Sequence, residues 1–188
     1  IRHICDKSNL KLVTKLKKNL VLTGMMGVGK STIGKNLAKK LKLKFVDIDK
    51  MIEDREKNKI KDIFKKNGEE YFRKIEKKLT MQILKNNSLV IAFGGGTFLD
   101  KSIREETKTS SVSFWLDLDT KSIIRRLKNV KKRPLLNQNK LEESINKIYS
   151  ERKKIYNKSN FRIKCNLMNV DQIVDKIVKL YENTKNKI

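Results

Sequence analysis

Residues 24–32 have the sequence GMMGVGKST, which fits the GxxxxGKS pattern of a phosphate-binding loop. The stretch follows the apolar run 20–23 and precedes apolar residues at four-residue spacing, so it should join a strand to a helix. In such a loop, glycines let backbone N–H groups turn toward phosphate oxygens, and the following helix N-terminus adds partial positive charge. We therefore expect a nucleoside triphosphate site in which Lys30 reaches the terminal phosphates and the Ser31 hydroxyl meets Mg²⁺. The residues of this expected site are Gly27, Val28, Gly29, Lys30, Ser31 and Thr32.

Strand-like and helix-like segments alternate from Asn19 onward, which is typical of an α/β fold with a parallel sheet covered on both faces. We expect strands over 20–23, 44–48, 89–93, 112–116 and 161–165. One helix is expected directly after the phosphate loop, two short helices over 51–66 before a stop at Gly68, and a further helix from about Phe72 to Ile83. A Ser102/Glu105 capping box should begin a short helix, and Asp119 should cap one that runs to Leu127. The last two helices are expected from Leu141 to Ile155 and over 171–181. The length of 188 residues suits a single domain over 19–188.

Composition limits the class of protein further. The longest uninterrupted apolar run, 89–93, is far shorter than a membrane span, so we expect a soluble protein without membrane contact. The formal net charge of +25 attracts anions, but the basic residues are spread over nearly every expected helix without interleaved aromatic residues, so no specific nucleic-acid surface is predicted. Cys5 and Cys165 belong to no CxxC or Cys/His cluster, which argues against a disulfide framework or a zinc site and suits a reducing compartment.

Two segments have no convincing place in this alternation. Residues 1–18 are basic and precede the first strand, and they fit a tail, a short helix or a cleaved organellar presequence equally well. Residues 128–140 contain the only proline among basic and polar residues, so we expect a mobile loop there.

Four further groups of residues are expected at the carboxyl ends of the strands or beside them, where ligands bind in open α/β sheets. They are the acids Asp47 and Asp49, the segment 68–76 (GEEYFRKIE), the glycines 94–96 and the segment 133–136 (RPLL). Together with the phosphate loop and with Arg152 in the segment 149–152 (YSER), this set resembles the shikimate kinases over nearly the whole chain from Asn19. Phe93 and Thr97 depart from the leucine and alanine that are more usual beside the glycines in that family.

The resemblance implies a three-layer P-loop kinase fold of the nucleoside-monophosphate-kinase type, with a substrate-binding segment over about 49–76 and a lid over about 128–140. It also implies phosphoryl transfer from ATP, with Mg²⁺, to the 3-hydroxyl of shikimate, a step of chorismate and aromatic amino-acid biosynthesis. Members of the family are usually monomers, and a bacterial cytoplasm or a plastid-like compartment would suit this step.

On the acceptor side, the resemblance assigns the carboxylate of shikimate to Arg73 and Arg152, whose planar guanidinium groups can bind a carboxylate bidentately. Asp49 would bind the substrate hydroxyls and take the proton of the one that is phosphorylated, and Glu76 would fix Arg73 from the next helical turn. The backbone N–H groups of Gly94, Gly95 and Gly96 would lie close to substrate and phosphate.

On the nucleotide side, the resemblance brings Lys30 and Arg133 together on the transferring phosphoryl group, with Arg133 arriving when the lid closes. Asp47 would belong to the outer shell of Mg²⁺ and Arg126 would stack on adenine. Three other interpretations stay open at this point: a related kinase for gluconate or nucleotides, a catalytically silent homologue that serves as a binding or regulatory module, and a nucleic-acid binder that uses the +25 charge.

Overall fold

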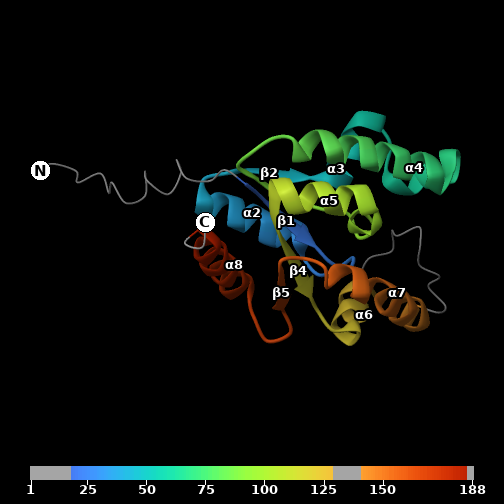
Figure 1. The fold of residues 1–188 in the computed structure, drawn as a ribbon. Helices are drawn as coiled ribbons and strands as arrows, with labels where there is room; N and C mark the ends of the chain where they lie inside the picture. The colour runs from blue at the N-terminus through green and yellow to red at the C-terminus, as the bar shows by residue number, and fades with distance from the viewer. Residues whose placement is uncertain (1–17, 129–140, 186–188) are drawn as a thin grey trace, which may run out of the picture.

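Five parallel strands form one sheet in the order β2-β3-β1-β4-β5 in the computed structural model, which describes residues 18–128 and 141–185 (Figure 1). The strands are β1 (Asn19–Thr23), β2 (Lys44–Asp47), β3 (Leu89–Ala92), β4 (Ser111–Asp117) and β5 (Phe161–Lys164). Every residue of β1 and β4 is buried, because helices cover both faces of these inner strands. The prediction of an α/β fold with five parallel strands is confirmed, and the predicted strand bounds differ from the observed ones by one residue at most at each end.

The helices are α2 (Lys30–Leu41), α3 (Ile48–Glu56), α4 (Ile60–Leu84), α5 (Lys101–Ser110), α6 (Thr120–Lys128), α7 (Leu141–Tyr156) and α8 (Val170–Lys185), with one 3₁₀ turn, η1 (Thr97–Leu99). Helices α2 and α8 pack together on one face of the sheet, and α4 and α5 pack together on the other (Figure 1). No helix within 18–128 and 141–185 is both long and apolar enough to cross a membrane.

The apolar spacing after the phosphate loop predicts the buried face of α2 correctly. Ile33, Leu37 and Leu41 are buried in the core, and Gly34 lets the helix approach β2 closely, since a Cβ there would overlap the ring of Phe45. This packing fixes the N-terminus of α2, and with it the phosphate loop, against the carboxyl end of the sheet.

Gly68 interrupts α4 as the sequence predicts. Its backbone has φ 82° and ψ 173°, so α4 consists of two helical pieces that meet at a kink. The Asp119 cap of α6 is also confirmed, because its carboxylate accepts a hydrogen bond from Ser122 N at 2.8 Å.

The predicted Ser102/Glu105 capping box is wrong. Asp100 caps α5 instead, and its carboxylate accepts a hydrogen bond from Ile103 N at 3.0 Å. Asp100 also forms an ion pair with Lys77 of α4. With Asp100 as the cap, α5 starts two residues earlier than the predicted box implies. Most of the expected tail, at 1–17, and the expected lid from 129 to 140, with Arg133, lie outside the described residues.

Candidate functional site

The phosphate loop joins β1 to α2 in the backbone conformation that its glycines allow. Gly27 and Gly29 have φ values of 79° and 97°, and Gly29 is the N-cap of α2. The Lys30 ammonium donates to the carbonyl oxygens of Gly24 and Met25 at 2.9 Å each, so it lies over the loop. A lysine held over a glycine-rich helix N-terminus is an arrangement that suits polyphosphate.

Ser31 and Asp47 meet at the carboxyl end of the sheet. The Ser31 hydroxyl donates to Asp47 Oδ2 at 2.5 Å, while Asp47 Oδ1 accepts the backbone N–H of Lys50 at 3.3 Å and so caps α3. A cavity of about 240 Å³ adjoins this pair and is also lined by Lys30 and Asp49. Hydroxyl and carboxylate oxygens beside a phosphate loop fit Mg²⁺, which takes one or two protein oxygens together with phosphate oxygens and water.

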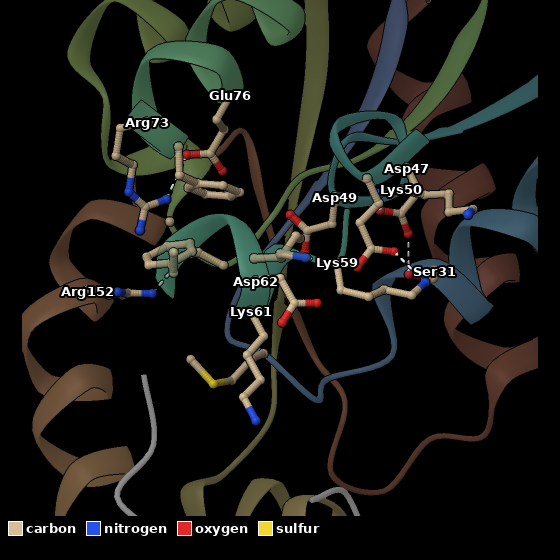
Figure 2. Close-up of a pocket in the computed structure, with 17 residues that line it drawn as sticks. Ser31, Asp47, Asp49, Lys50, Lys59, Lys61, Asp62, Arg73, Glu76 and Arg152 are labelled. Carbon is tan, nitrogen blue, oxygen red and sulfur yellow. Dashed lines mark hydrogen bonds and ion pairs between the residues drawn. The ribbon is translucent and has the colours of Figure 1, made fainter. Parts of the chain in front are cut away.

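A larger cavity of about 830 Å³ lies beside the loop, between α3, α4, α7 and the glycines 95 and 96. Asp49 of α3, Arg73 of α4 and Arg152 of α7 line it together, so residues far apart in sequence meet there. Figure 2 shows Asp49 between the Ser31–Asp47 pair and the two arginines.

One wall of this cavity is apolar. Phe64 and Phe72 lie with ring centroids 4.6 Å apart across the kink of α4, and Ile60 lines the cavity beside them. The Arg73 guanidinium lies 5.2 Å from the centroid of the Phe72 ring. The cavity therefore offers carbon surface on one side and charged groups on the others, as a small polar ring compound requires.

Two carboxylates hold Arg73. Glu76 Oε2 accepts from Nη1 at 2.7 Å, and Glu69 Oε1 accepts from Nε and Nη2 at 3.2 and 3.0 Å. Burial lowers the pKa of Arg73, but the charges and hydrogen bonds of Glu76 and Glu69 outweigh burial and leave this pKa above its ordinary value. The expected contact between Arg73 and Glu76 is present, and the guanidinium stays charged at every pH of practical interest.

The glycines 94–96 make room for these side chains. A Cβ on Gly94 would lie 2.5 Å from Asp49 Oδ1, and one on Gly96 would lie 2.7 Å from Arg73 Nη2. Both distances are shorter than a Cβ contact tolerates, so a side chain at either position would displace Asp49 or Arg73. This close approach of side chains is a second reason for the glycines, beyond the N–H donors that the resemblance implies.

Gly95 connects the glycines to α7. Its carbonyl oxygen accepts hydrogen bonds from Arg152 Nη1 at 3.0 Å and from the Tyr156 hydroxyl at 2.5 Å. Tyr156 is buried, and burial is the main reason why its pKa is raised. The bond from Tyr156 holds the Gly95 carbonyl in place, and the bond to this carbonyl fixes Arg152 at the edge of the cavity.

Arg126 reaches the phosphate loop from α6. Its Nη1 atom donates to the carbonyl oxygens of Gly27 and Val28, at 3.4 and 3.2 Å. The guanidinium thus lies beside the loop, next to the region where a bound nucleotide would extend from its phosphates.

The sequence analysis did not identify three residues that this geometry brings into the site: Glu69, Thr97 and Tyr156. Spacing could have indicated Glu69, because it precedes Arg73 by four residues on one helix. Thr97 stands out in the sequence as a departure from the usual alanine, but neither its partner nor that of Tyr156 could be inferred, since each contacts a residue more than 20 positions away. Within 18–128 and 141–185, no group of three or more His, Cys, Asp or Glu side chains is arranged to hold a metal ion.

Comparisons with known proteins agree with this geometry. A family model described as shikimate kinase matches residues 26–182. The shikimate kinase of Sulfurihydrogenibium sp. (strain YO3AOP1) is 44% identical over 161 residues, which cover 86% of this chain and 96% of that relative. The solved shikimate kinase from Acinetobacter baumannii in complex with shikimate has a TM-score of 0.88 and 30% identity, covering 93% of this chain and 98% of that one. The shikimate kinase from Aquifex aeolicus has a TM-score of 0.78 and 32% identity, covering 89% and 98% of the two chains. This chain therefore belongs to the shikimate kinase family.

Proposed function

We propose that this protein transfers a phosphoryl group from ATP, with Mg²⁺, to the 3-hydroxyl of shikimate, which gives shikimate 3-phosphate and ADP. The observation that carries the proposal is the meeting of Asp49, Arg73 and Arg152 in one cavity that adjoins the phosphate loop. Shikimate has one carboxylate, three hydroxyls and a carbon ring, so it needs cations, a carboxylate acceptor and an apolar wall. The Acinetobacter relative was solved with shikimate, which supports the same acceptor here.

On the acceptor side, Arg73 and Arg152 bind the substrate carboxylate, and the Phe64–Phe72 wall contacts the ring. Asp49 accepts hydrogen bonds from the substrate hydroxyls and orients the 3-hydroxyl toward the phosphate loop. In a loose phosphoryl-transfer transition state, the proton of the nucleophile leaves late, so orientation by Asp49 matters more than its basicity. Asp49 then takes this proton. The substrate-binding segment is accordingly 49–76.

On the nucleotide side, the backbone of Gly27 to Thr32 surrounds the phosphates and Lys30 moves from the loop carbonyls to the terminal phosphates. Ser31 would ligate Mg²⁺, and Asp47 would lie in its outer shell. When bound, Mg²⁺ neutralises charge on the phosphate oxygens. Arg126 stacks on adenine from its place beside the loop. Arg133 belongs to a lid over 128–140, and it supplies positive charge to the transferring group when the lid closes and excludes water.

The alternative interpretations fit less well. A silent homologue would be expected to lack one of the groups that bind phosphate or acceptor, whereas Lys30, Asp49 and Arg73 are all present at the two cavities. A nucleoside monophosphate has no carboxylate for the two arginines, and gluconate, which has one, is an open chain without a carbon ring to pack on the Phe64–Phe72 wall. A single domain over 19–188 that acts as a monomer is sufficient for this chemistry, and the bacterial relatives favour a bacterial cytoplasm.

The position of the new phosphate tests the proposal directly. The purified protein is incubated with MgATP and shikimate, and the product is examined by ³¹P and ¹H NMR. We expect one product, in which phosphorus couples to the proton on carbon 3. A phosphate on another hydroxyl would contradict the orientation by Asp49, and release of inorganic phosphate alone would contradict the proposed acceptor.

A further inference from the structure

Thr97 is a buried residue that ends the glycine segment and begins η1. Its hydroxyl donates to Glu76 Oε1 at 2.6 Å, and Glu76 Oε2 accepts from Arg73 Nη1 at 2.7 Å. Thr97 and Glu76 are only 1% and 3% exposed, so water does not replace either bond readily. A continuous chain of hydrogen bonds thus runs from the start of η1 to the guanidinium that we assign to the substrate carboxylate.

Glu76 depends on this hydroxyl for its orientation. A buried carboxylate is costly unless donors satisfy its oxygens, and each oxygen of Glu76 has one donor in this chain. If the Thr97 hydroxyl is removed, Oε1 loses its donor in a dry environment, and the carboxylate can rotate away from Arg73 to find another. Arg73 would then be held by Glu69 alone, whose side chain is 57% exposed.

Thr97 also lies where two negative charges approach each other. The ideal Cβ position on Gly94 is 3.0 Å from both Glu76 Oε1 and Thr97 Oγ1, and 2.5 Å from Asp49 Oδ1. Asp49 Oδ1 and Glu76 Oε1 therefore both lie beside Gly94, and Oε1 is the Glu76 oxygen that accepts the Thr97 hydroxyl. A donor on this oxygen stabilises the Glu76 carboxylate close to a second negative charge.

We propose that Thr97 is a positioning residue for substrate recognition, which acts through Glu76 to hold Arg73 in the geometry that binds the substrate carboxylate. This inference rests on the proposed function for the identity of the ligand. The hydrogen bonds from Thr97 through Glu76 to Arg73 are independent of that proposal. It belongs to recognition of the acceptor rather than to phosphoryl transfer, because Thr97 contacts the group that holds Arg73 and not the phosphate loop.

The first test compares Thr97→Val, which removes the hydroxyl at nearly constant volume, with Thr97→Ser, which keeps it. We expect Thr97→Val to raise the KM for shikimate about tenfold and to leave kcat and the KM for ATP within about twofold. Thr97→Ser should restore the KM to near the wild-type value. Thr107→Val is the matched control, because Thr107 is equally buried and its hydroxyl donates to the Ile103 carbonyl of its own helix, α5.

Three results would overturn the proposal: a KM for shikimate that rises no more in Thr97→Val than in Thr107→Val, an equal rise in Thr97→Ser, or a loss confined to kcat. If Thr97→Val does not fold, Thr97→Ala removes the same hydroxyl with less crowding and is measured in its place. Calorimetric titration of shikimate without nucleotide should show the same order of affinities as the KM values.

A second test keeps the inference separable from the proposed function. Urea unfolding of Thr97→Val, Glu76→Ala and the double variant measures the coupling between the two side chains without any ligand. We expect the effects to be non-additive, since each change removes the same hydrogen bond. Additive effects would refute the chain from Thr97 to Glu76. Clear coupling in a protein that fails to bind shikimate would leave the chain in place and reject the ligand.

Discussion

Glu69 occupies the Nε and Nη2 edge of Arg73, with its Oε1 atom 3.2 and 3.0 Å from the two nitrogens. This edge presents two parallel N–H groups, the arrangement with which arginine binds a carboxylate bidentately. Glu76 holds Nη1 from the buried side, so Arg73 has one fixed carboxylate partner and one exposed partner. A substrate carboxylate that takes the Nε and Nη2 edge must displace Glu69.

We predict that Glu69→Ala lowers the KM for shikimate. The Glu69 side chain is 57% exposed, and exposed ion pairs contribute about 0.2 to 1 kcal/mol, which corresponds to a decrease of about 1.5- to 5-fold. The kcat should not change, because Glu69 contacts only the guanidinium. Steady-state kinetics over a range of shikimate concentrations measures both constants.

Glu70→Ala is the matched control for Glu69→Ala. It removes the same charge one residue away on α4, at an exposed position. If both variants lower the KM equally, general attraction of an anion explains the change, and direct competition at Arg73 is refuted. An increase in KM for Glu69→Ala would show that Glu69 helps to hold Arg73 for the substrate.

Asp49→Asn should lower kcat by about 10²- to 10³-fold, because an amide has one accepting oxygen instead of two with which to orient the hydroxyls and cannot take the proton. The affinity for ATP, measured by titration of a fluorescent analogue, should remain near the wild-type value. Asp54→Asn serves as a control, since Asp54 lies on the same helix and pairs with Lys50 on the surface. Near-normal turnover of a folded Asp49→Asn variant would remove Asp49 from the proposed chemistry.

Gly96→Ala should weaken shikimate binding without a large change in ATP binding. The added Cβ would lie 2.7 Å from Arg73 Nη2, so the guanidinium must move. We expect an increase in KM of at least about tenfold, which is the effect of losing about 1.4 kcal/mol of binding. A double-mutant cycle with Arg73→Ala provides the check: the Gly96 substitution should have little further effect once Arg73 is absent. Full additivity would place the cause outside Arg73.

The environment of Tyr149 in α7 predicts a pH dependence of stability. Burial and the nearby carboxylate of Asp117, which accepts from the Tyr149 hydroxyl at 2.9 Å, raise the pKa of Tyr149 from 10.0 to about 12. The folded state thus favours the protonated phenol, and the resulting stability is complete below pH 10 and is lost as the pH rises toward about 12.

Tyr149→Phe tests this pH dependence. At about pH 8 the variant should be less stable by about 1 kcal/mol, the net value of one hydrogen bond. At about pH 11, the difference in the free energy of unfolding between the two proteins should be smaller, because the phenol of the unfolded wild type is ionised there. Urea titrations at both pH values measure this difference. A difference that stays constant or grows with pH would contradict the assigned cause.

The sequence was most informative where function depends on local spacing. The phosphate loop and the kink at Gly68 follow from glycine positions, and the contact of Arg73 with Glu76 follows from helical spacing. The bond between Ser31 and Asp47 needs only the strand order in addition, because the carboxyl ends of parallel strands share one edge of the sheet.

Contacts that depend on tertiary packing could not be predicted in this way. Thr97 has no periodic or motif signal, and its bond to Glu76 exists because the turn after β3 packs on α4. The wrong prediction for the cap of α5 has a related reason. Asp100 and Ser102 are both residue types that suit a helix start. Asp100 is the one that caps α5, and it also forms an ion pair with Lys77 on α4, a tertiary contact that local sequence does not indicate.

Coupled release of ADP from the purified protein with MgATP tests the central claim most directly. Shikimate, gluconate, a set of nucleoside monophosphates and a sample without acceptor are compared under the same conditions. The account predicts turnover that depends on shikimate and a background rate with every other acceptor. No shikimate-dependent turnover from folded protein that still binds ATP, or equal turnover with gluconate or a nucleotide, would contradict it.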